Sequence, residues 1–468
     1  MTIASLERMS DGELSDAARA LGLAAADGTP RRDLIYEILE AQATEAAGPG
    51  AGPGSRTEVR RRPVRVRRPI AASWPAYMQG FDPTRAVLDG LIRAVGVLEL
   101  LPDGYGFLRS VEYSYLPSAD DIYVSPSQIK RFSLRLGDTV DGHVRPPKEG
   151  ERFFALLRVH SVNGRTPELF TERTGYDFLT PGYPDAPLRL EPRAGAPALP
   201  PGAALTARLV DLVAPIGKGQ RGLIVAPPGA GRTTLVEHLA RAIRAGHPEA
   251  TLIVLLVDER PEDVTAVERA LPGAEVIATT FDEPPERQVH VADLVLEKAK
   301  RLVEAGQDVV ILLDSLTRLV RAHNSVARVG GAEPRPAAAL DPAAARGPKR
   351  LFGAARAVEE GGSLTVLATI LVETGSALDD AIFEEFTGTG NLEIRLRRDI
   401  AQAGLFPAVD VLASGTRRVE VLLAPERLAA VRALRAGLIG LAPGAALAAL
   451  TARIRETPTN DDLLGTTD

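Results

Sequence analysis

Apolar and polar positions follow three patterns along the chain, and each pattern predicts a different kind of structure. Residues 1–45 place leucine and isoleucine at helical spacing, which predicts a small N-terminal helical module. Residues 94–165 hold five short apolar runs separated by turns, which predicts a small β-barrel. Residues 206–468 alternate continuous apolar runs with amphipathic stretches, which predicts a parallel sheet covered by helices on both faces.

Two segments without clear periodicity separate these predicted domains. Residues 46–93 are interpreted as a flexible basic linker, because GPGAGPGS at 48–55 precedes seven arginines and one glutamate between residues 56 and 68. Such a charge run is usually a solvated tether, and contact with a polyanion is the alternative interpretation. Residues 166–205, rich in proline, glycine and leucine, are interpreted as a connector.

Five strands and two long helices are predicted in the last domain. The strands are expected at residues 222–226, 252–257, 309–313, 364–372 and 391–396, and the helices at 233–246 and 288–304. Parallel sheets of this kind bind their ligands at the carboxyl ends of the strands. Side chains at those ends are therefore the first candidates for a binding site.

The first of these strands leads into a segment typical of phosphate binding. GLIVAPPGAGRTTLVEHLA (222–240) predicts a buried strand, a loop rich in glycine and proline, and a helix whose N-terminus faces the loop. A threonine at that helix start, Thr233, can ligate Mg²⁺. The general phosphate-loop pattern has Lys where this chain has Arg232 and Gly where it has Ala226. A tight turn that binds no ligand is the alternative interpretation.

Acidic residues follow two other predicted strands. Asp258 and Glu259 come after the second strand, and Asp314 ends the third. Asp314 is the usual kind of residue for holding Mg²⁺ through water, and Glu259 can polarise an attacking water. A single acid at a strand end can simply cap a helix. Two strand ends with acids beside a phosphate loop favour a catalytic site.

In the predicted barrel, aromatic residues alternate with glycines. Tyr105 and Phe107 lie at period two, so they share a face of the strand, and Arg109 follows them. Aromatic rings on a barrel face next to arginine form a stacking platform for single-stranded bases. The alternative interpretation is a pair of core aromatics. Nearby Tyr123 and basic residues favour nucleic acid; the basic residues are Lys130, Arg131, Arg145 and Lys148.

Composition limits the remaining possibilities. The 468 residues are 45% hydrophobic and include no cysteine, which excludes disulfides and thiolate chemistry. The first residues lack the apolar core of a signal peptide, and no apolar run reaches membrane-spanning length, so we expect a cytoplasmic protein without a membrane partner. The net charge is only −6, so a surface that binds nucleic acid must be a local patch.

Long segments of the chain resemble the bacterial Rho family of transcription termination factors. They occur in the same order and span nearly the whole chain: DGYGFLRS (103–110), DDIYVSPSQI (120–129), RPPKEGERFFAL (145–156), PIGKGQRGLIVAPP (215–228), LLVDERPEDVT (255–265), TTFDEPPERQV (279–289), ILLDSLTRL (311–319), FGAARAVEEGGSLT (352–365), EEFTGTGN (384–391) and SGTRR (414–418).

The resemblance implies a multidomain chain with a cold-shock-like OB barrel and a RecA-type α/β ATPase domain. It also implies a homohexamer that binds nascent single-stranded RNA and translocates along it by RNA-dependent hydrolysis of ATP with Mg²⁺, as a helicase that releases transcripts from the RNA polymerase elongation complex. The primary RNA site would comprise Gly104, Tyr105, Gly106, Phe107, Leu108, Arg109, Asp121, Ile122, Tyr123, Glu151, Arg152 and Phe153.

The resemblance further implies roles for residues of the ATPase domain. Nucleotide binding would involve Gly217, Lys218, Gly219, Gln220, Arg221, Gly222, Gly229, Ala230, Gly231, Arg232, Thr233, Thr234 and Arg260, with Thr233 and Asp314 on the metal. Catalysis would involve Arg232, Glu259 as the activator of water, and Arg417 as an arginine finger that reaches the neighbouring subunit's ATP, assisted by Arg398.

Several positions depart from the pattern of this family. Both lysines of the family's loop APPKAGKT are replaced, by Gly229 and Arg232. Ala377 stands in place of a pore lysine, and Gly404 in place of an arginine near the subunit boundary. Residues 324–347 form a long loop rich in alanine and proline. In the barrel, the departure is Phe153 in place of tyrosine.

Two functional hypotheses therefore stay open. The first is an RNA-dependent ATPase that terminates transcription. The second is an RNA-binding hexamer of the same architecture with impaired hydrolysis, which acts as a regulator or as a subunit of mixed rings, because Arg232 cannot copy the compact ammonium of a phosphate-loop lysine. A generic ring motor of the ATP-synthase type is disfavoured, because it does not account for the aromatic strand of the barrel.

Overall fold

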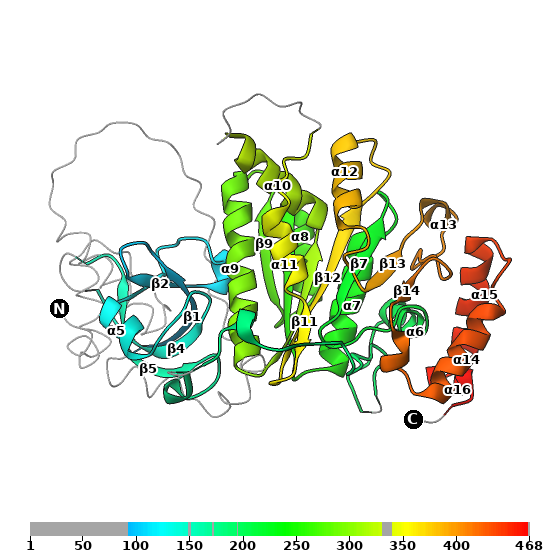
Figure 1. Ribbon diagram of the computed structural model, residues 1–468, viewed down its shortest axis with the longest axis horizontal. Helices are drawn as coiled ribbons and strands as arrows, with labels where there is room; N and C mark the ends of the chain where they lie inside the picture. Colours follow the sequence, from blue (N-terminus) through cyan, green and yellow to red (C-terminus); the bar gives the residue numbers. More distant parts are fainter. Residues whose placement is uncertain (1–91, 148–150, 171–172, 194, 330–338, 467–468) are drawn as a thin grey trace, which may run out of the picture. The chain divides into compact units, whose positions relative to one another are not determined.

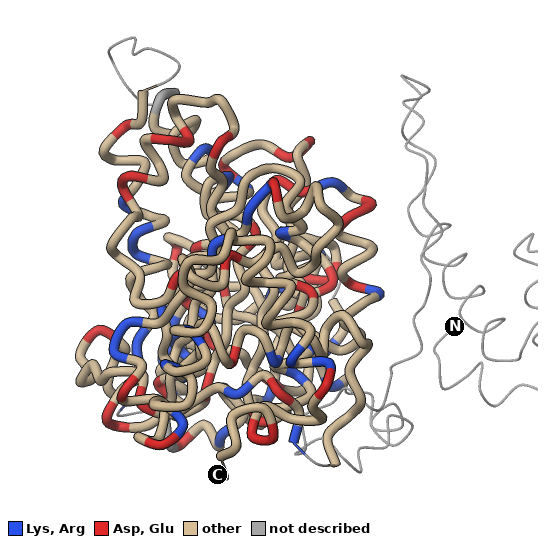
Figure 2. Tube along the Cα trace, turned by 90° about the vertical axis from the view of Figure 1, so that its right-hand side faces the viewer, with Lys and Arg blue, Asp and Glu red and all other residues tan. Residues whose placement is uncertain are grey.

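The computed structural model of the protein describes residues 92–147, 151–170, 173–193, 195–329 and 339–466 (Figure 1). The helical module predicted for residues 1–45 lies outside the described residues, as does the basic linker except for its last two positions. Along the described part of the chain, acidic and basic positions are interspersed (Figure 2). This distribution agrees with the small net charge.

The predicted five-stranded barrel is confirmed. Its strands are β1 (Ile92–Leu100), β2 (Gly106–Arg109), β3 (Ile122–Val124), β4 (Thr139–Arg145) and β5 (Phe154–Val162), and they close in the order β1-β2-β3-β5-β4. Alternate residues of each strand point into the barrel, where Leu98, Leu108, Val124 and Val140 are at most 1% exposed. A short helix, α5 (Pro126–Arg131), connects β3 to β4.

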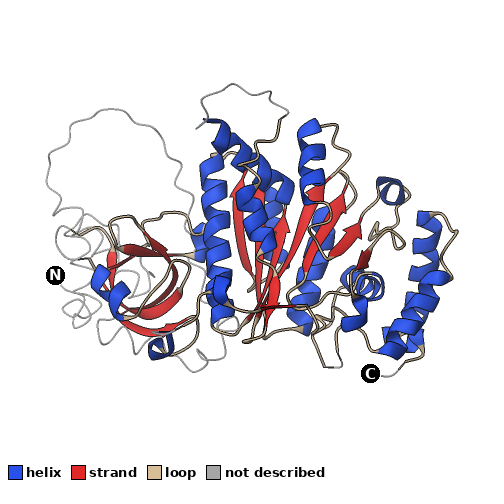
Figure 3. Ribbon diagram, viewed as in Figure 1, coloured by secondary structure: helices blue, strands red, loops and turns tan. Residues whose placement is uncertain are grey.

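The predicted ATPase domain is built on a mainly parallel sheet with helices on both faces (Figure 3). All five predicted strands are present, and the central order is β13-β7-β12-β10-β8-β9. The bounds are β7 (Arg221–Ala226), β8 (Thr251–Glu259), β9 (Glu275–Thr280), β10 (Asp308–Asp314), β12 (Ser363–Leu371) and β13 (Leu392–Arg395), with β14 (Gly415–Thr416) antiparallel to β13. Sequence reasoning missed β9, whose threonines and glutamate interrupt the apolar pattern.

The connector also contributes to this sheet. Its short strand β6 (Pro181–Gly182) pairs with β11 (Arg356–Val358), which in turn pairs with β12. Tyr176 of the connector is buried, and its hydroxyl donates to the carbonyl of Ala354. The connector therefore packs onto the ATPase domain and is more than a tether.

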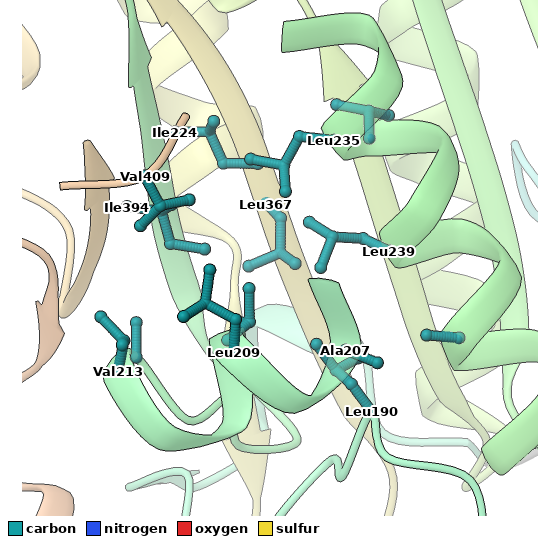
Figure 4. Close-up of a cluster of buried hydrophobic side chains, with 14 of the residues drawn as sticks. Leu190, Ala207, Leu209, Val213, Ile224, Leu235, Leu239, Leu367, Ile394 and Val409 are labelled. Carbon is teal, nitrogen blue, oxygen red and sulfur yellow. The ribbon is translucent and has the colours of Figure 1, made fainter. Parts of the chain in front are cut away.

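Eleven helices of the described residues from 201 onward cover the sheet or follow it. They are α6 (Pro201–Val213), α7 (Arg232–Gly246), α8 (Pro261–Ala270), α9 (Pro285–Glu304), α10 (Leu316–Val329), α11 (Arg346–Gly353), α12 (Ala377–Phe386), α13 (Arg398–Gln402), α14 (Pro425–Ala436), α15 (Pro443–Glu456) and α16 (Asn460–Leu464). On one face, Leu209 of α6 and Leu235 of α7 pack near Ile224 and Leu367 (Figure 4). Burial of such side chains contributes roughly 2 kcal/mol each to stability.

The predicted bounds of the loop at residues 324–347 are wrong at both ends. Helix α10 continues to Val329, and α11 begins at Arg346. The start of the helix is anchored by buried Leu316 and Leu319, and buried Val320 and Ala322 continue its packed face toward residue 324. The side-chain oxygen of Asn324 accepts a hydrogen bond from the backbone of Asp341, which ties the returning chain to the helix.

The barrel contacts the ATPase domain through a turn that follows β2. The turn presents Ser114 and Tyr115, both at positive φ. The hydroxyl of Ser114 accepts from the backbone of Ala278 in β9 at 3.0 Å. Buried Tyr115 donates to Glu275 and accepts from Lys298 of α9, which itself pairs with Glu275. The turn after β2 thus joins the barrel directly to the edge of the sheet.

Candidate functional sites

The predicted phosphate loop has the expected backbone. Strand β7 is almost fully buried and ends at Ala226, and α7 begins at Arg232. Gly229 and Gly231 have φ of 79° and 80°, which favours glycine and turns the backbone N–H groups toward a common centre. Gly231 is the N-cap of α7 and provides no side-chain cap, so the positive end of the helix is available to an anion.

The two predicted acids lie at the same edge of the sheet. Glu259 ends β8 and Asp314 ends β10, and these strands are parallel neighbours. Both carboxylates are buried, with Asp314 completely inaccessible. The hydroxyl of Thr369 donates to Asp314 at 2.8 Å, and that of Thr233 donates to it at 3.4 Å.

Arg232 bridges the two carboxylates. Its Nε lies 2.8 Å from Oδ1 of Asp314, and its Nη2 lies 2.8 Å from Oε1 of Glu259. A second arginine, Arg318, lies 2.7 Å from the same oxygen of Glu259. Sequence reasoning missed Arg318, which lies in the first turn of α10, the helix that follows Asp314.

The surroundings of Glu259 alter its acidity. Burial and the nearby charge of Asp314 raise its pKa, while Arg318 and Arg232 oppose the rise, and the net shift is upward. A carboxylate with a raised pKa holds a proton more readily than an exposed one. Perturbed pKa values of this kind concentrate at functional sites.

An exposed aromatic residue lies beside the phosphate loop. The side chain of Phe406 is 54% exposed, and its ring atoms lie 3.4–3.5 Å from the position of a Cβ on Gly231. A ring in that position offers a flat apolar surface next to the place where phosphates are expected. No periodicity marks Phe406 in the sequence, so it was not predicted as a site residue.

The predicted nucleotide residues 217–222 lie at the other edge of the sheet. Lys218 pairs with Asp308, the first residue of β10, and the backbone of Gly219 donates to Thr365 near the start of β12. Strand β7 separates these residues from the phosphate loop by about 20 Å. They shape the turn that enters β7, at the opposite end of this strand from the phosphate loop, and their assignment to nucleotide binding stays a prediction.

The two predicted arginines of the finger are also separated. Exposed Arg417 follows β14, and its backbone donates to Asn391 just before β13. Arg398 follows the carboxyl end of β13 and donates to the carbonyl of Glu373. They thus lie at opposite ends of one strand, so the expectation that they assist each other at one pocket is not supported by the geometry.

Three other predicted residues lie close to the phosphate loop or to Glu259. Ala230 is buried in the loop, and Thr234 is exposed in the first turn of α7. Arg260 is exposed as the N-cap of α8, immediately after Glu259. Ala377 is exposed at the first turn of α12.

The barrel carries a cluster of four aromatic rings, as the alternation of Tyr105 and Phe107 predicted. Ring centroids lie 5.9 Å apart for Tyr105 and Phe107, 5.7 Å for Tyr105 and Tyr123, and 4.9 Å for Phe107 and Phe153. Gly106 is required here, since a Cβ would lie 2.5 Å from the carbonyl of Glu99. The rings are only partly buried, which disfavours the interpretation as core aromatics.

A cleft of about 670 Å³ adjoins two of these rings. Its lining is mixed, with aromatic, hydroxyl, amide and basic side chains that include Tyr123, Ser125, Gln128, Arg131, Arg145, Glu151, Arg152 and Phe153. Arg145 and Glu151 form an ion pair at 2.5 Å on one side of the cleft. A flat ring with polar edges, such as a nucleobase, matches this combination.

Four predicted RNA-binding residues have buried side chains. Leu108 and Ile122 are part of the barrel core, and Arg109 is only 6% exposed. Arg109 pairs with buried Asp121 and with Glu99, and its guanidinium lies 5.2 Å from the centre of the Phe107 ring. Leu108 and Ile122 therefore support the aromatic strand from the barrel interior. Arg109 lies beside the Phe107 ring but is buried with its acidic partners, which corrects the expectation of an exposed arginine at the end of the platform.

Comparisons with known proteins agree with both sites. Residues 94–168 match the Rho termination factor RNA-binding domain, and residues 206–416 match the nucleotide-binding domain of the ATP synthase alpha/beta family. None of the described helices has the length and apolar character needed to cross a membrane.

Curated relatives cover most of the chain. Transcription termination factor Rho of Pseudomonas aeruginosa is 53% identical over 78% of this chain and 86% of its own length. The Escherichia coli protein of the same name is 52% identical over the same shares. Among solved structures, an ATPase of a type III secretion system has a TM-score of 0.45 at 26% identity, over 49% of this chain and 66% of that one. On the identity and coverage of these curated relatives, the chain belongs to the family of Rho transcription termination factors.

Proposed function

We propose that this protein binds nascent single-stranded RNA on the aromatic face of its barrel and hydrolyses ATP in an RNA-dependent manner at the carboxyl edge of its sheet. The energy moves the protein along the RNA and releases the transcript from RNA polymerase. The observation that carries the proposal is the convergence of the phosphate loop, Thr233, Glu259 and Asp314 in a chain that also presents four clustered aromatic rings. Membership of the Rho family favours it over the ring with impaired hydrolysis.

Nucleotide binding is assigned to the loop and its surroundings. The phosphates lie against the N–H groups of residues 229–233 at the positive end of α7. The adenine stacks on the ring of Phe406, whose exposed face adjoins Gly231. This arrangement places the terminal phosphate toward Glu259 and Asp314.

The residues at this edge also fit Mg²⁺. Asp314 and the hydroxyl of Thr233 are hard oxygen donors, which Mg²⁺ prefers. The guanidinium of Arg232 already places a positive charge between the carboxylates of Asp314 and Glu259. A bound ion would be held by Asp314 and Thr233 together with oxygens of the nucleotide phosphates. The metal would neutralise charge that develops on the phosphates during transfer.

Glu259 is the residue that orients and polarises the attacking water. Its burial and raised pKa suit a proton acceptor, provided that Arg232 has left it. Arg417 lies at the amino edge of the sheet and so acts on the ATP of a neighbouring copy. A pocket completed by the next subunit requires a closed ring, and we propose the homohexamer, acting in the cytoplasm.

A transcription assay tests the proposal as a whole. Elongation complexes halted on a template whose transcript is rich in pyrimidines are mixed with the protein, and free RNA is measured. We expect release only when ATP and the protein are both present, and no release with Glu259→Gln. Release that is equal without ATP, or absent with ATP despite RNA binding, would contradict the proposed translocation.

A further inference from the structure

Arg232 makes contacts at the carboxyl edge of the sheet that a phosphate-loop lysine cannot make. Its Nη2 donates a hydrogen bond to Glu259 at 2.8 Å, and its Nε forms an ion pair with Asp314, also at 2.8 Å. The planar fork suits this two-carboxylate bridge, whereas an ammonium is a point charge at the end of a flexible stem. The Arg232 side chain is 13% exposed, so the bridge is shielded from water.

Two arginines lie against the two buried carboxylates of the bridge. Asp314 is completely buried and the Glu259 side chain is 6% exposed, so two negative charges lie in a region of low dielectric constant. Arg232 and Arg318 supply two positive charges to them. Because a buried charge that loses its partner is strongly destabilising, the carboxylates need a cation at all times.

Arg232 contacts the same carboxylate that the proposed Mg²⁺ site uses, that of Asp314. The hydroxyl of Thr233 lies 3.4 Å from the second oxygen of Asp314, so the hydroxyl, the carboxylate and the guanidinium share one small space. A divalent cation bound to Asp314 would lie against the guanidinium. Like charges at that separation repel each other, so the two cations exclude each other.

We propose that Arg232 is a built-in competitor of the divalent cation: it holds Asp314 and Glu259 until phosphates of a nucleotide draw it to the loop, and only then does the metal take its place. The proposal rests on the proposed nucleotide site. Arg232 is the first residue of α7, directly beside the loop N–H groups, so a bound phosphate gives its fork a bidentate partner.

Two consequences follow from this exchange. A divalent cation alone binds the nucleotide-free protein poorly, because it must displace an internal cation that contacts both carboxylates. Glu259 is blocked as a proton acceptor while Arg232 donates to it, so the pocket is inert until a nucleotide arrives. Arg232 is therefore a positioning residue that sets the order in which phosphate and metal bind.

Mn²⁺ binding to the nucleotide-free, full-length protein tests the proposal, with the free ion measured by electron paramagnetic resonance. We expect Arg232→Ala to bind one additional Mn²⁺ per chain. The affinity of this variant for that ion should be at least about tenfold higher than the affinity of the parent for an ion at the same site. The double variant Arg232→Ala with Asp314→Asn should lose that additional ion, which separates it from adventitious surface sites. Arg232→Lys, which keeps a charge, should lie between the parent and Arg232→Ala.

Equal Mn²⁺ affinity of the parent, Arg232→Lys and Arg232→Ala would overturn the proposal. So would an additional ion that persists in the double variant. Arg232→Lys keeps the test decisive if circular dichroism shows that Arg232→Ala is misfolded. Nucleotide binding is measured separately with fluorescent ADP: its failure in the parent would refute the proposed nucleotide site, whereas the competition between Mn²⁺ and Arg232 is read without any nucleotide.

Discussion

At the scale of single residues, the phosphate pocket depends on a side chain that is unusual for its position. Arg232 keeps the positive charge of the family's lysine, but this charge is paired with Glu259 and Asp314. The sequence was sufficient to find Arg232, Thr233, Glu259 and Asp314, because each adjoins the end of a predicted strand or loop. The bridge itself could not be predicted, since it depends on the rotamer of one long side chain.

Replacement of Arg232 by lysine should speed up ATP hydrolysis. An ammonium reaches between phosphate oxygens and leaves Glu259 free, whereas a displaced donor in a transition state typically reduces the rate by a factor on the order of 100. We expect RNA-stimulated turnover to rise on the order of tenfold or more in Arg232→Lys, with ADP affinity nearly unchanged. Unchanged or slower turnover beside a fast parent would mean that the loop is adapted to arginine.

Truncation of Phe107 should weaken RNA binding. Its ring contacts Tyr105, Tyr123 and Phe153, and loss of one stacking surface typically removes about 1–3 kcal/mol of affinity for single strands. Filter binding of a pyrimidine-rich RNA to Phe107→Ala measures this loss. The matched control is Phe178→Ala, an exposed aromatic outside the cluster, which should bind like the parent. Equal affinity of the two variants would assign Phe107 to the core.

At the scale of elements, the apolar pattern predicted the buried strands, and it failed for strands and contacts that leave no regular apolar pattern in the sequence. The five barrel strands and five sheet strands were found because their apolar runs are uninterrupted by polar residues or alternate regularly with them. Strand β9 was missed because its threonines and glutamate interrupt the apolar pattern. Residues 217–222 were assigned by resemblance, and the structure places them at the other end of β7 from the phosphate loop. Arg109 was misjudged because its partner Glu99 lies on another strand.

The contact between β1 and α9 should respond to pH. His290 of α9 lies 3.1 Å from Glu99, and the hydrogen bond to Glu99 is the main cause of the raised pKa of His290. The charges of Glu99 and Asp293 add to the rise, whereas burial and Arg109 oppose it. Burial alone would raise the pKa of Glu99, but His290 and Arg109 hold it below its usual range. Glu99 therefore stays ionised near neutral pH, and only His290 titrates there.

The sign of the effect follows from the raised pKa of His290. Its contribution to stability is complete below the unfolded value of about 6.5 and disappears as pH rises through the higher folded value. We expect the free energy of unfolding in urea to fall by less than about 1 kcal/mol across this window, since the partly exposed pair is screened by solvent. In His290→Gln that fall should shrink, and an identical pH profile would show that the pair contributes nothing.

At the scale of the whole molecule, the account requires that two copies complete one active pocket. Glu259 and Arg417 lie at opposite edges of the same sheet, so one chain cannot bring them together. Glu259→Gln and Arg417→Ala should each be inactive as ATPases. A mixture of the two should recover part of the activity, because some interfaces then pair an intact Glu259 with an intact Arg417. Full activity of Arg417→Ala alone, or no recovery after proven subunit exchange, would contradict this arrangement.

The most direct measurement of the central claim is the ATPase rate of the full-length protein with and without single-stranded pyrimidine-rich RNA. The account predicts that the RNA stimulates hydrolysis, that Glu259→Gln abolishes it while ADP still binds, and that Phe107→Ala needs a higher RNA concentration to reach the same rate. Hydrolysis that is absent in the parent under all RNA concentrations, or that proceeds equally without RNA, would contradict an RNA-dependent ATPase.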